Sequence, residues 1–220
     1  MAADPKDIIR WNSDRAVVPV PVFGELDPLP VGKTRFLMAR GGLYLETLTI
    51  WGRLCINLWR PRFDLGHFGE VEEIDEWLPF FQQKLNPIIE ESMLGPAAEQ
   101  ALQGKEWAGW IMCEDGVCFY QPLEQLATAD KVVLNRISGG PATLVGDVHS
   151  HGKIPVFFSP TDDKDDASEV KICVVVGGYD EERSQFKMRI RYAINGIFVP
   201  DISTLQEEHT LSGTMMLVSV

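Results

Sequence analysis

The chain has 220 residues, of which 45% are hydrophobic, which is enough for one well-cored domain and a smaller one. No apolar run approaches the roughly 20 residues of a membrane-spanning helix, and the charged start does not resemble a signal peptide, so we expect a soluble, cytoplasmic protein with no membrane partner. The formal net charge of -12 argues against nucleic acid as a partner, because phosphate binding needs a basic surface.

The cysteines predict free thiols in a reducing cytosol. There are four of them, too few for a disulfide framework in a chain of this length, and none forms a C-x-x-C pair. Cys113 and Cys118 flank a predicted turn, so the two could face each other across a hairpin.

The pattern of residue types changes near residue 70. Residues 1–70 are rich in β-branched and aromatic residues broken by Gly and Pro, which predicts a β-rich N-terminal domain without recognisable chemistry. From Glu72 to Gln103, apolar residues recur at three- and four-residue steps, which predicts one or two amphipathic helices with breaks at Pro87 and at Gly95-Pro96. We therefore expect a second domain over residues 71–220.

Strand patterns dominate the rest of the chain. A hairpin is predicted over residues 107–123, with a turn at Gly116, and residues 142–151 predict a buried strand that ends in polar residues. Residues 170–178 predict an apolar strand, and residues 186–199 a strand pair that turns at Asn195-Gly196. Together with the helices, these strands predict an α/β fold for this domain.

Two histidines stand at the end of the predicted strand over residues 142–151. His149 and His151 are two residues apart, and the period of a strand places both imidazoles on one face, where they can reach one metal ion. Taken alone, the pair is equally compatible with exposed polar residues at a strand end.

A capped helix start follows the histidines. In Ser159-Pro160-Thr161-Asp162, Ser159 suits the N-cap and proline the first helical position, so Asp162 projects from the first turn. Two histidines and one carboxylate form a known zinc ligand set that leaves a position for water. The alternatives are that Ser159 is only a cap and that Asp162 only complements the helix dipole, as its acidic neighbours could too: Asp163, Asp165 and Asp166.

A hydrolase with such a metal needs a base that takes a proton from the attacking water. Glu106, at the start of the predicted hairpin, is our candidate. A glutamate at a helix-to-strand junction is more often solvated than catalytic, and Glu46 is a second upstream glutamate that could be confused with it.

These residues together resemble a known family. His149-Ser150-His151, seven residues and then Ser159-Pro160-Thr161-Asp162 resemble the JAMM (MPN+) signature H-x-H-x(7)-S-x-x-D, and Glu106 to Gly109 resembles its upstream E-x-x-G. The string from Asp147 to Gly178 is also similar to the bacterial PRTRC system protein A subgroup, whose JAB domain follows a poorly characterised N-terminal region.

The resemblance implies a JAB/MPN fold, a mixed, curved sheet flanked by helices. It also implies a zinc-dependent metalloprotease or isopeptidase that cuts after the C-terminal tail of a ubiquitin-like protein, with activating and conjugating enzymes as further partners. His149, His151 and Asp162 would bind Zn²⁺, Glu106 would be the acid/base, and Ser159 would donate a hydrogen bond to the oxyanion.

Two other functions compete with the protease. One is a metal-free MPN scaffold, against which the presence of all the motif residues argues. The other is a zinc deaminase, whose H-x-E and P-C-x-x-C signature is absent. We also expect a ubiquitin-like tail to bind as an added strand, with the β-prone run KVVLNRI between Tyr120 and Pro141 as the candidate edge.

Overall fold

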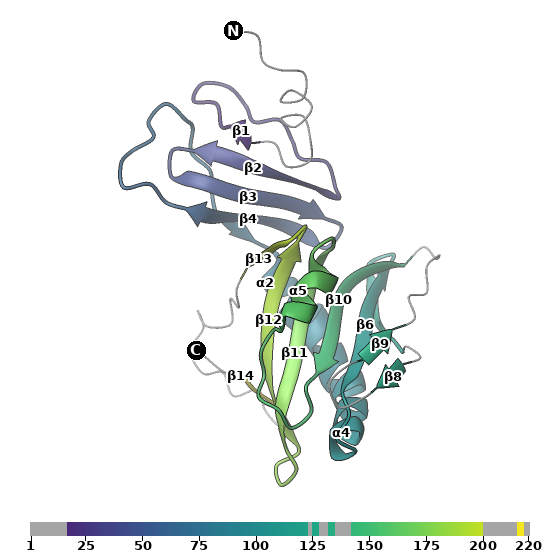
Figure 1. The fold of residues 1–220 in the computed structure, drawn as a ribbon. Coiled ribbons are helices and arrows are strands. Elements are labelled where there is room, and N and C mark those ends of the chain that lie inside the picture. The colour runs from purple at the N-terminus through teal and green to yellow at the C-terminus, as the bar shows by residue number, and fades with distance from the viewer. Residues whose placement is uncertain (1–16, 123–124, 128–131, 135–141, 200–214, 218–220) are drawn as a thin grey trace. The chain divides into compact units, whose positions relative to one another are not determined.

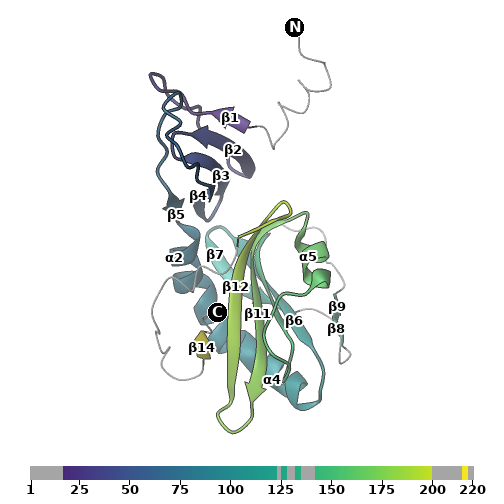
Figure 2. The ribbon, with the colours of Figure 1, turned by 60° about the vertical axis from the view of Figure 1, so that its left-hand side comes forward.

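The computed structural model describes residues 17–122, 125–127, 132–134, 142–199 and 215–217. The chain divides into two compact units, Met1–Phe80 and Phe81–Val220 (Figures 1 and 2). Within the described residues, no helix combines the length and the apolar character needed to cross a membrane.

The first unit is a five-stranded sheet, which confirms the prediction of a β-rich N-terminal region. Its strand order is β1-β2-β3-β4-β5; β1 pairs with β2 in parallel and the other pairs are antiparallel. Leu37, Ala39, Tyr44 and Cys55 contribute to its core. The elements are β1 (Val17–Pro19), β2 (Lys33–Ala39), β3 (Gly42–Thr49), β4 (Gly52–Trp59), β5 (Ile74–Asp75) and helix α2 (Trp77–Phe80).

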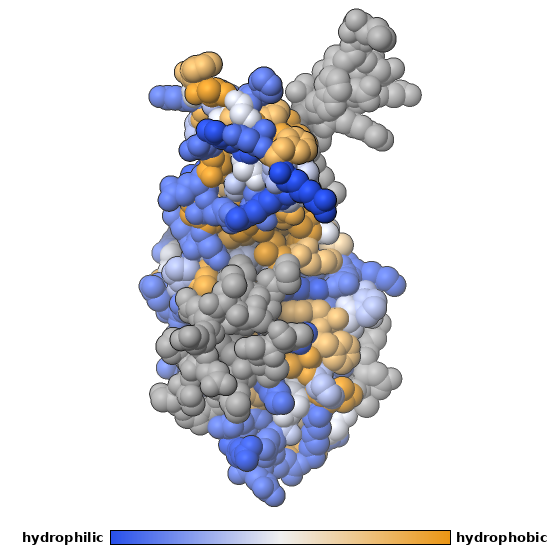
Figure 3. Space-filling view, turned by 90° about the vertical axis from the view of Figure 1, so that its left-hand side faces the viewer, coloured by the Kyte–Doolittle hydropathy of each residue, from blue (hydrophilic) through white to orange (hydrophobic). Residues whose placement is uncertain are grey.

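Several large apolar side chains of the first unit are exposed. They include Phe23, Trp59 and Phe63. On the face drawn in Figure 3, hydrophobic residues lie among hydrophilic ones in this unit. The unit therefore keeps part of its aromatic content outside its core.

The second unit is built around a mixed sheet, as the α/β prediction requires. The strand order is β13-β12-β11-β10-β6-β7, with β14 paired to β12. The pairs β10–β11 and β12–β14 are parallel, and the others are antiparallel. Its strands are β6 (Trp107–Glu114), β7 (Val117–Gln121), β10 (Thr143–Ser150), β11 (Val170–Asp180), β12 (Gln185–Ile194), β13 (Ile197–Val199) and β14 (Met215–Leu217).

Two predicted hairpins form at the predicted turns. Asp115 and Gly116 join β6 to β7 with φ of 49° and 79°, and Asn195 and Gly196 join β12 to β13 with φ of 50° and 84°. Positive φ at both central residues is the signature of the type I′ turn, whose twist matches that of the strands. The first hairpin also places Cys113 opposite Cys118, both as free thiols, as predicted.

The helical region before β6 continues through its prolines, so the predicted breaks at Pro87 and Gly95-Pro96 are wrong. In this unit it runs through η1 (Phe81–Leu85), α3 (Asn86–Ile88), η2 (Ile89–Met93) and α4 (Leu94–Leu102), where η denotes π-helical turns. The backbone hydrogen-bond pattern changes from i→i+5 to i→i+4 just before Pro87. At such a change the helix tolerates a residue that has no N–H to donate.

The π-helical turns also explain how one face of this region stays buried. The buried residues recur every fourth position, whereas an α-helical turn has only 3.6 residues, so a pure α-helix would rotate the stripe away. The wider π turns offset this rotation. The buried stripe consists of Phe81, Leu85, Ile89, Met93, Ala97 and Ala101.

Helices cover the two faces of the sheet (Figure 2). A Cβ atom on Gly146 of β10 would lie 3.2 Å from Leu85, which places the helical region on one face. Helix α5 (Pro160–Asp166) lies on the other face, where Asp166 contacts Lys171 of β11 and Arg191 of β12. The face under α5 carries the candidate site.

The segment proposed to bind a substrate tail is described only in part. Residues 125–127 form β8 (Gln125–Ala127) and residues 132–134 form β9 (Val132–Leu134), which pair antiparallel as a separate two-stranded sheet. The rest of KVVLNRI lies outside the described residues.

Candidate metal centre

Strand β10 delivers both histidines to the face under α5. The strand is anchored between β6 and β11, and the backbone N–H of His151 donates to Val176 O at 2.9 Å, which extends the pairing by one residue. His149 and His151 share a face, as their spacing predicts, and their ring centroids are 5.2 Å apart. The rings of Phe157 and Phe158 flank them, at 4.5 Å from His151 and 6.3 Å from His149.

A capping box orients Asp162 toward the histidines. Ser159 is the N-cap of α5: its Oγ accepts from the backbone N–H of Asp162 at 3.3 Å, and its own N–H donates to Asp162 Oδ2 at 2.6 Å. Pro160 starts the helix, as predicted. The reciprocal bonds fix the carboxylate, and its Oδ2 lies 3.5 Å from His149 Nε2.

The structure brings the three predicted ligands together. One donor atom from each of His149, His151 and Asp162 lies within 4.8 Å of the other two. Their role as metal ligands remains a prediction.

Two of the imidazole nitrogens make no hydrogen bond with the described residues. They are His149 Nε2 and His151 Nδ1, and both are buried. A buried polar group without a partner costs about 1–3 kcal/mol, so native structures rarely leave one unless an ion or water satisfies it. Two nitrogens and a carboxylate oxygen are donors that suit zinc. The residues present therefore fit a zinc ion.

The electrostatic field at His149 favours positive charge. Burial alone would lower the pKa of His149, but the carboxylates of Asp162, Asp147 and Asp166 raise it above its ordinary value. Burial would raise the pKa of Asp162, but His149 and the Ser159 backbone hold it well below its usual range. The pKa of His151 is lowered, first by burial and then by His149. The site thus stabilises a cation beside an ionised Asp162.

Glu106 directly precedes β6 and is half-buried. In the antiparallel pair β6–β10, Trp107 is opposite Ser150 and Ala108 is opposite His149. Extending this register by one residue puts Glu106 across from His151, and residues directly opposite share a face. The backbone geometry thus places Glu106 on the histidine face, while its predicted role as the acid/base remains untested.

Gly109, the last residue of the E-x-x-G motif, is required by packing. A Cβ atom there would lie 2.7 Å from Tyr120, 2.9 Å from Trp107 and 3.0 Å from Met93. Any side chain would displace these rings or the helical region. Packing therefore accounts for the glycine at this position.

Glu46 has a different setting from Glu106. It lies on β3 of the first unit with 1% of its side chain exposed. Arg35 Nε donates to its Oε2 at 2.6 Å, and Arg53 Nε donates to its Oε1 at 2.8 Å. Both oxygens are held by guanidinium groups, so Glu46 is a structural ion-pair partner.

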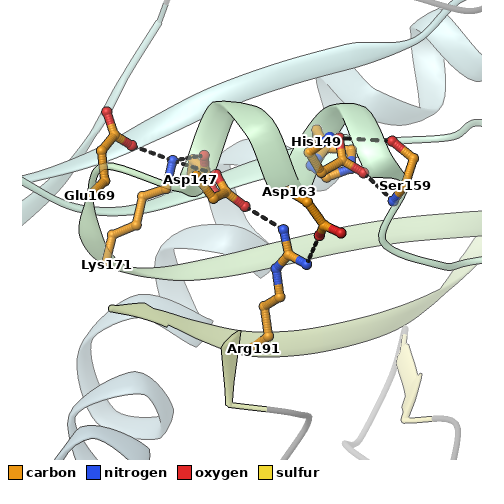
Figure 4. Close-up of polar contacts among 9 residues, drawn as sticks. Asp147, His149, Ser159, Asp163, Glu169, Lys171 and Arg191 are labelled. Atoms are coloured by element: carbon orange, nitrogen blue, oxygen red, sulfur yellow. Dashed lines mark hydrogen bonds and ion pairs between the residues drawn. The ribbon is translucent and has the colours of Figure 1, made fainter. Parts of the chain in front are cut away.

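Two of the acidic neighbours of Asp162 have partners of their own. Asp163 binds Arg191 (Figure 4). Asp166 binds Arg191 and, at 2.8 Å, Lys171. Asp147, Asp166 and Cys173 also come within 4.8 Å of one another, but Lys171 Nζ already contacts both carboxylates. That second group is therefore occupied by an ammonium.

Sequence reasoning missed Lys171 and Arg191. The signal for them was weak but present: each is a charged residue inside an otherwise apolar strand, and a charge buried in this way needs a partner.

Comparison with known proteins agrees with this geometry. Residues 94–191 match the family model of prokaryotic homologs of the JAB domain, a range that includes Glu106, both histidines and α5. This part of the chain is a JAB-family domain. Its JAB domain follows a region, residues 9–78, that matches a domain of unknown function, DUF2016.

No curated protein matches the chain. Among solved structures, it is similar to the solution structure of protein DSY2949 from Desulfitobacterium hafniense, with 11% identity and a TM-score of 0.34, covering 61% of this chain and 90% of that one.

Proposed function

We propose that the JAB domain is a zinc-dependent peptidase that cleaves the bond after the C-terminal tail of a ubiquitin-like protein, either in a precursor or in a conjugate. The observation that carries the proposal is the convergence of His149, His151 and Asp162, with two buried imidazole nitrogens that lack hydrogen-bond partners among the described residues. An open three-ligand site of this kind is typical of catalytic rather than structural zinc.

The protein groups divide the chemistry among them. Zinc bound here would polarise the scissile carbonyl and lower the pKa of a water to about 7. Glu106 accepts the proton of the attacking water and returns it to the leaving amine. Ser159 Oγ uses a lone pair to accept from Asp162 N–H, which leaves its own O–H to donate to the developing oxyanion.

The substrate class is the one that the resemblance to the JAMM family implies, and the way the tail binds follows from its composition. A tail of small residues offers few side chains to hold, so it is best bound in an extended form by main-chain hydrogen bonds. The β8–β9 pair is two-stranded, so within the described residues each strand has one unpaired edge. We assign the tail to the outer edge of β9, and we expect the enzymes that activate and conjugate the ubiquitin-like protein to act in the same system.

Cleavage of fusion proteins tests this function. The zinc-loaded protein is incubated with bacterial ubiquitin-like proteins, each carrying a reporter peptide after its tail, and products are identified by mass spectrometry. We expect one fusion to be cut directly after the tail and His149→Ala to cut none. Zinc-loaded wild-type protein that leaves every fusion intact would favour the scaffold function.

A further inference from the structure

A cluster of charged side chains lies buried beneath α5. Lys171 and Arg191 come from neighbouring strands of the sheet and have only 4% and 6% of their side chains exposed. Burying a charge costs several kcal/mol unless partners compensate it, so their contacts must be extensive. We define the α5 clamp as these two residues together with the carboxylates they bind, Asp147, Asp163, Asp166 and Glu169.

Arg191 contacts residues that precede and residues that follow the first turn of α5 in the sequence. Its guanidinium donates to Asp163 and, at 2.7 Å, to Asp166 on the helix. The same group lies 4.0 Å from the ring of Phe158, the residue just before the N-cap Ser159, and 4.1 Å from the ring of Phe198. Arg191 therefore contacts the chain immediately before and immediately after Ser159 to Asp162. Figure 4 shows its contact with Asp163.

Lys171 joins α5 to the strand that carries the histidines. Its Nζ lies 2.8 Å from Asp166 of α5 and 2.6 Å from Asp147 of β10, two residues before His149. A third contact, at 2.6 Å, reaches Glu169 just after the helix. The clamp thus connects the two elements that supply the predicted ligands.

We propose that Arg191 is a positioning residue for the metal centre: it fixes the first turn of α5 so that Asp162 meets an ion bound by His149 and His151. This inference rests on the proposed zinc site and adds a residue to it. A lysine cannot replace this arginine, because only a planar guanidinium can lie against two phenyl rings while it binds two carboxylates.

The test measures metal binding by the metal-free full chain. Wild type, Arg191→Lys and Arg191→Met are titrated with Zn²⁺ against a competing chelator, and with Co²⁺, whose visible spectrum reports coordination geometry. We expect Arg191→Lys to fold and to bind zinc roughly 10- to 100-fold more weakly, the usual effect of losing a residue that orients a ligand, with an altered Co²⁺ spectrum. Arg191→Met should weaken binding further, because it removes the guanidinium from Asp163 and leaves Lys171 to pair with Asp166.

Arg35→Lys is the matched control. Arg35 has 12% of its side chain exposed and pairs with the buried Glu46 in the first unit, so its replacement also disturbs a buried ion pair. We expect it to lower stability and leave zinc affinity and the Co²⁺ spectrum unchanged. Wild-type affinity and spectrum in Arg191→Lys would overturn the positioning role, whatever its melting temperature. Wild-type protein that binds neither ion would overturn the zinc site itself.

Discussion

At the residue scale, Glu46 and Glu106 differ in where the fold places them. Glu46 has both oxygens bound by arginines within the first unit. Glu106 precedes β6 on the face that carries the histidines, as the register with β10 indicates. Both oxygens of Glu46 are occupied by arginines, whereas Glu106 lies on the face where a water of the proposed metal centre would be.

We therefore predict that Glu106→Gln loses activity while zinc stays bound, because the amide keeps the shape of the side chain but cannot accept a proton. The expected fall in kcat/KM on a cleavable ubiquitin-like fusion is about 10²- to 10⁴-fold, the usual contribution of general acid–base catalysis. Glu46→Gln is the control, expected to cut normally and to unfold at lower temperature. Near-normal cleavage by Glu106→Gln would remove it from the mechanism.

The candidate ligands were predictable because each depends on local geometry. A spacing of two on a strand and an aspartate three residues after a serine cap both follow from backbone periods. The clamp was not predictable in this way, since Asp147 pairs with Lys171 across 24 residues and Asp163 with Arg191 across 28. Such pairs become visible only once the sheet order is known.

At the element scale, the predictions that depend on local backbone geometry were correct, and the prediction of helix breaks, which depends on tertiary packing, was wrong. The hairpins formed where Asp-Gly and Asn-Gly occur, because these residues tolerate the positive φ that a type I′ turn needs. The helical region did not break at Pro87, because its hydrogen-bond pattern changes beside that residue. The buried stripe repeats every four residues, and its packing against the sheet is a tertiary effect. This packing favours the π-helical turns, which the periodicity of the sequence did not predict.

Strand β9 gives a prediction at this scale. Successive residues of a strand direct their N–H groups to opposite sides, so Val132→Pro and Val133→Pro probe its two edges separately. The variant that lacks an outward N–H cannot make one main-chain hydrogen bond to the tail, which is worth about 0.5–1.5 kcal/mol. Its kcat/KM on the fusion should therefore be roughly two- to tenfold lower. Zinc content should stay unchanged in both. Wild-type cleavage by both variants would exclude β9 as the tail-binding edge.

At the scale of the whole molecule, the candidate chemistry lies within one of the two units. The JAB domain contains Glu106, the histidines, α5 and the clamp, all between residues 81 and 220. The first unit has its own sheet, its own core and a buried Glu46 ion pair. The sequence predicted the β-rich character of the first unit and the α/β character of the second, because strand and helix periods are visible without knowledge of the packing.

The central claim is that His149, His151 and Asp162 bind zinc, and the zinc content of the purified protein tests it most directly. Elemental analysis should find about one zinc per chain in the wild type and in His67→Ala, a control at an exposed histidine of the first unit. His149→Ala should lose the metal, because two ligands cannot hold a catalytic zinc against competing chelators. Full zinc content in a folded His149→Ala variant would contradict the ligand assignment, and with it the proposed chemistry.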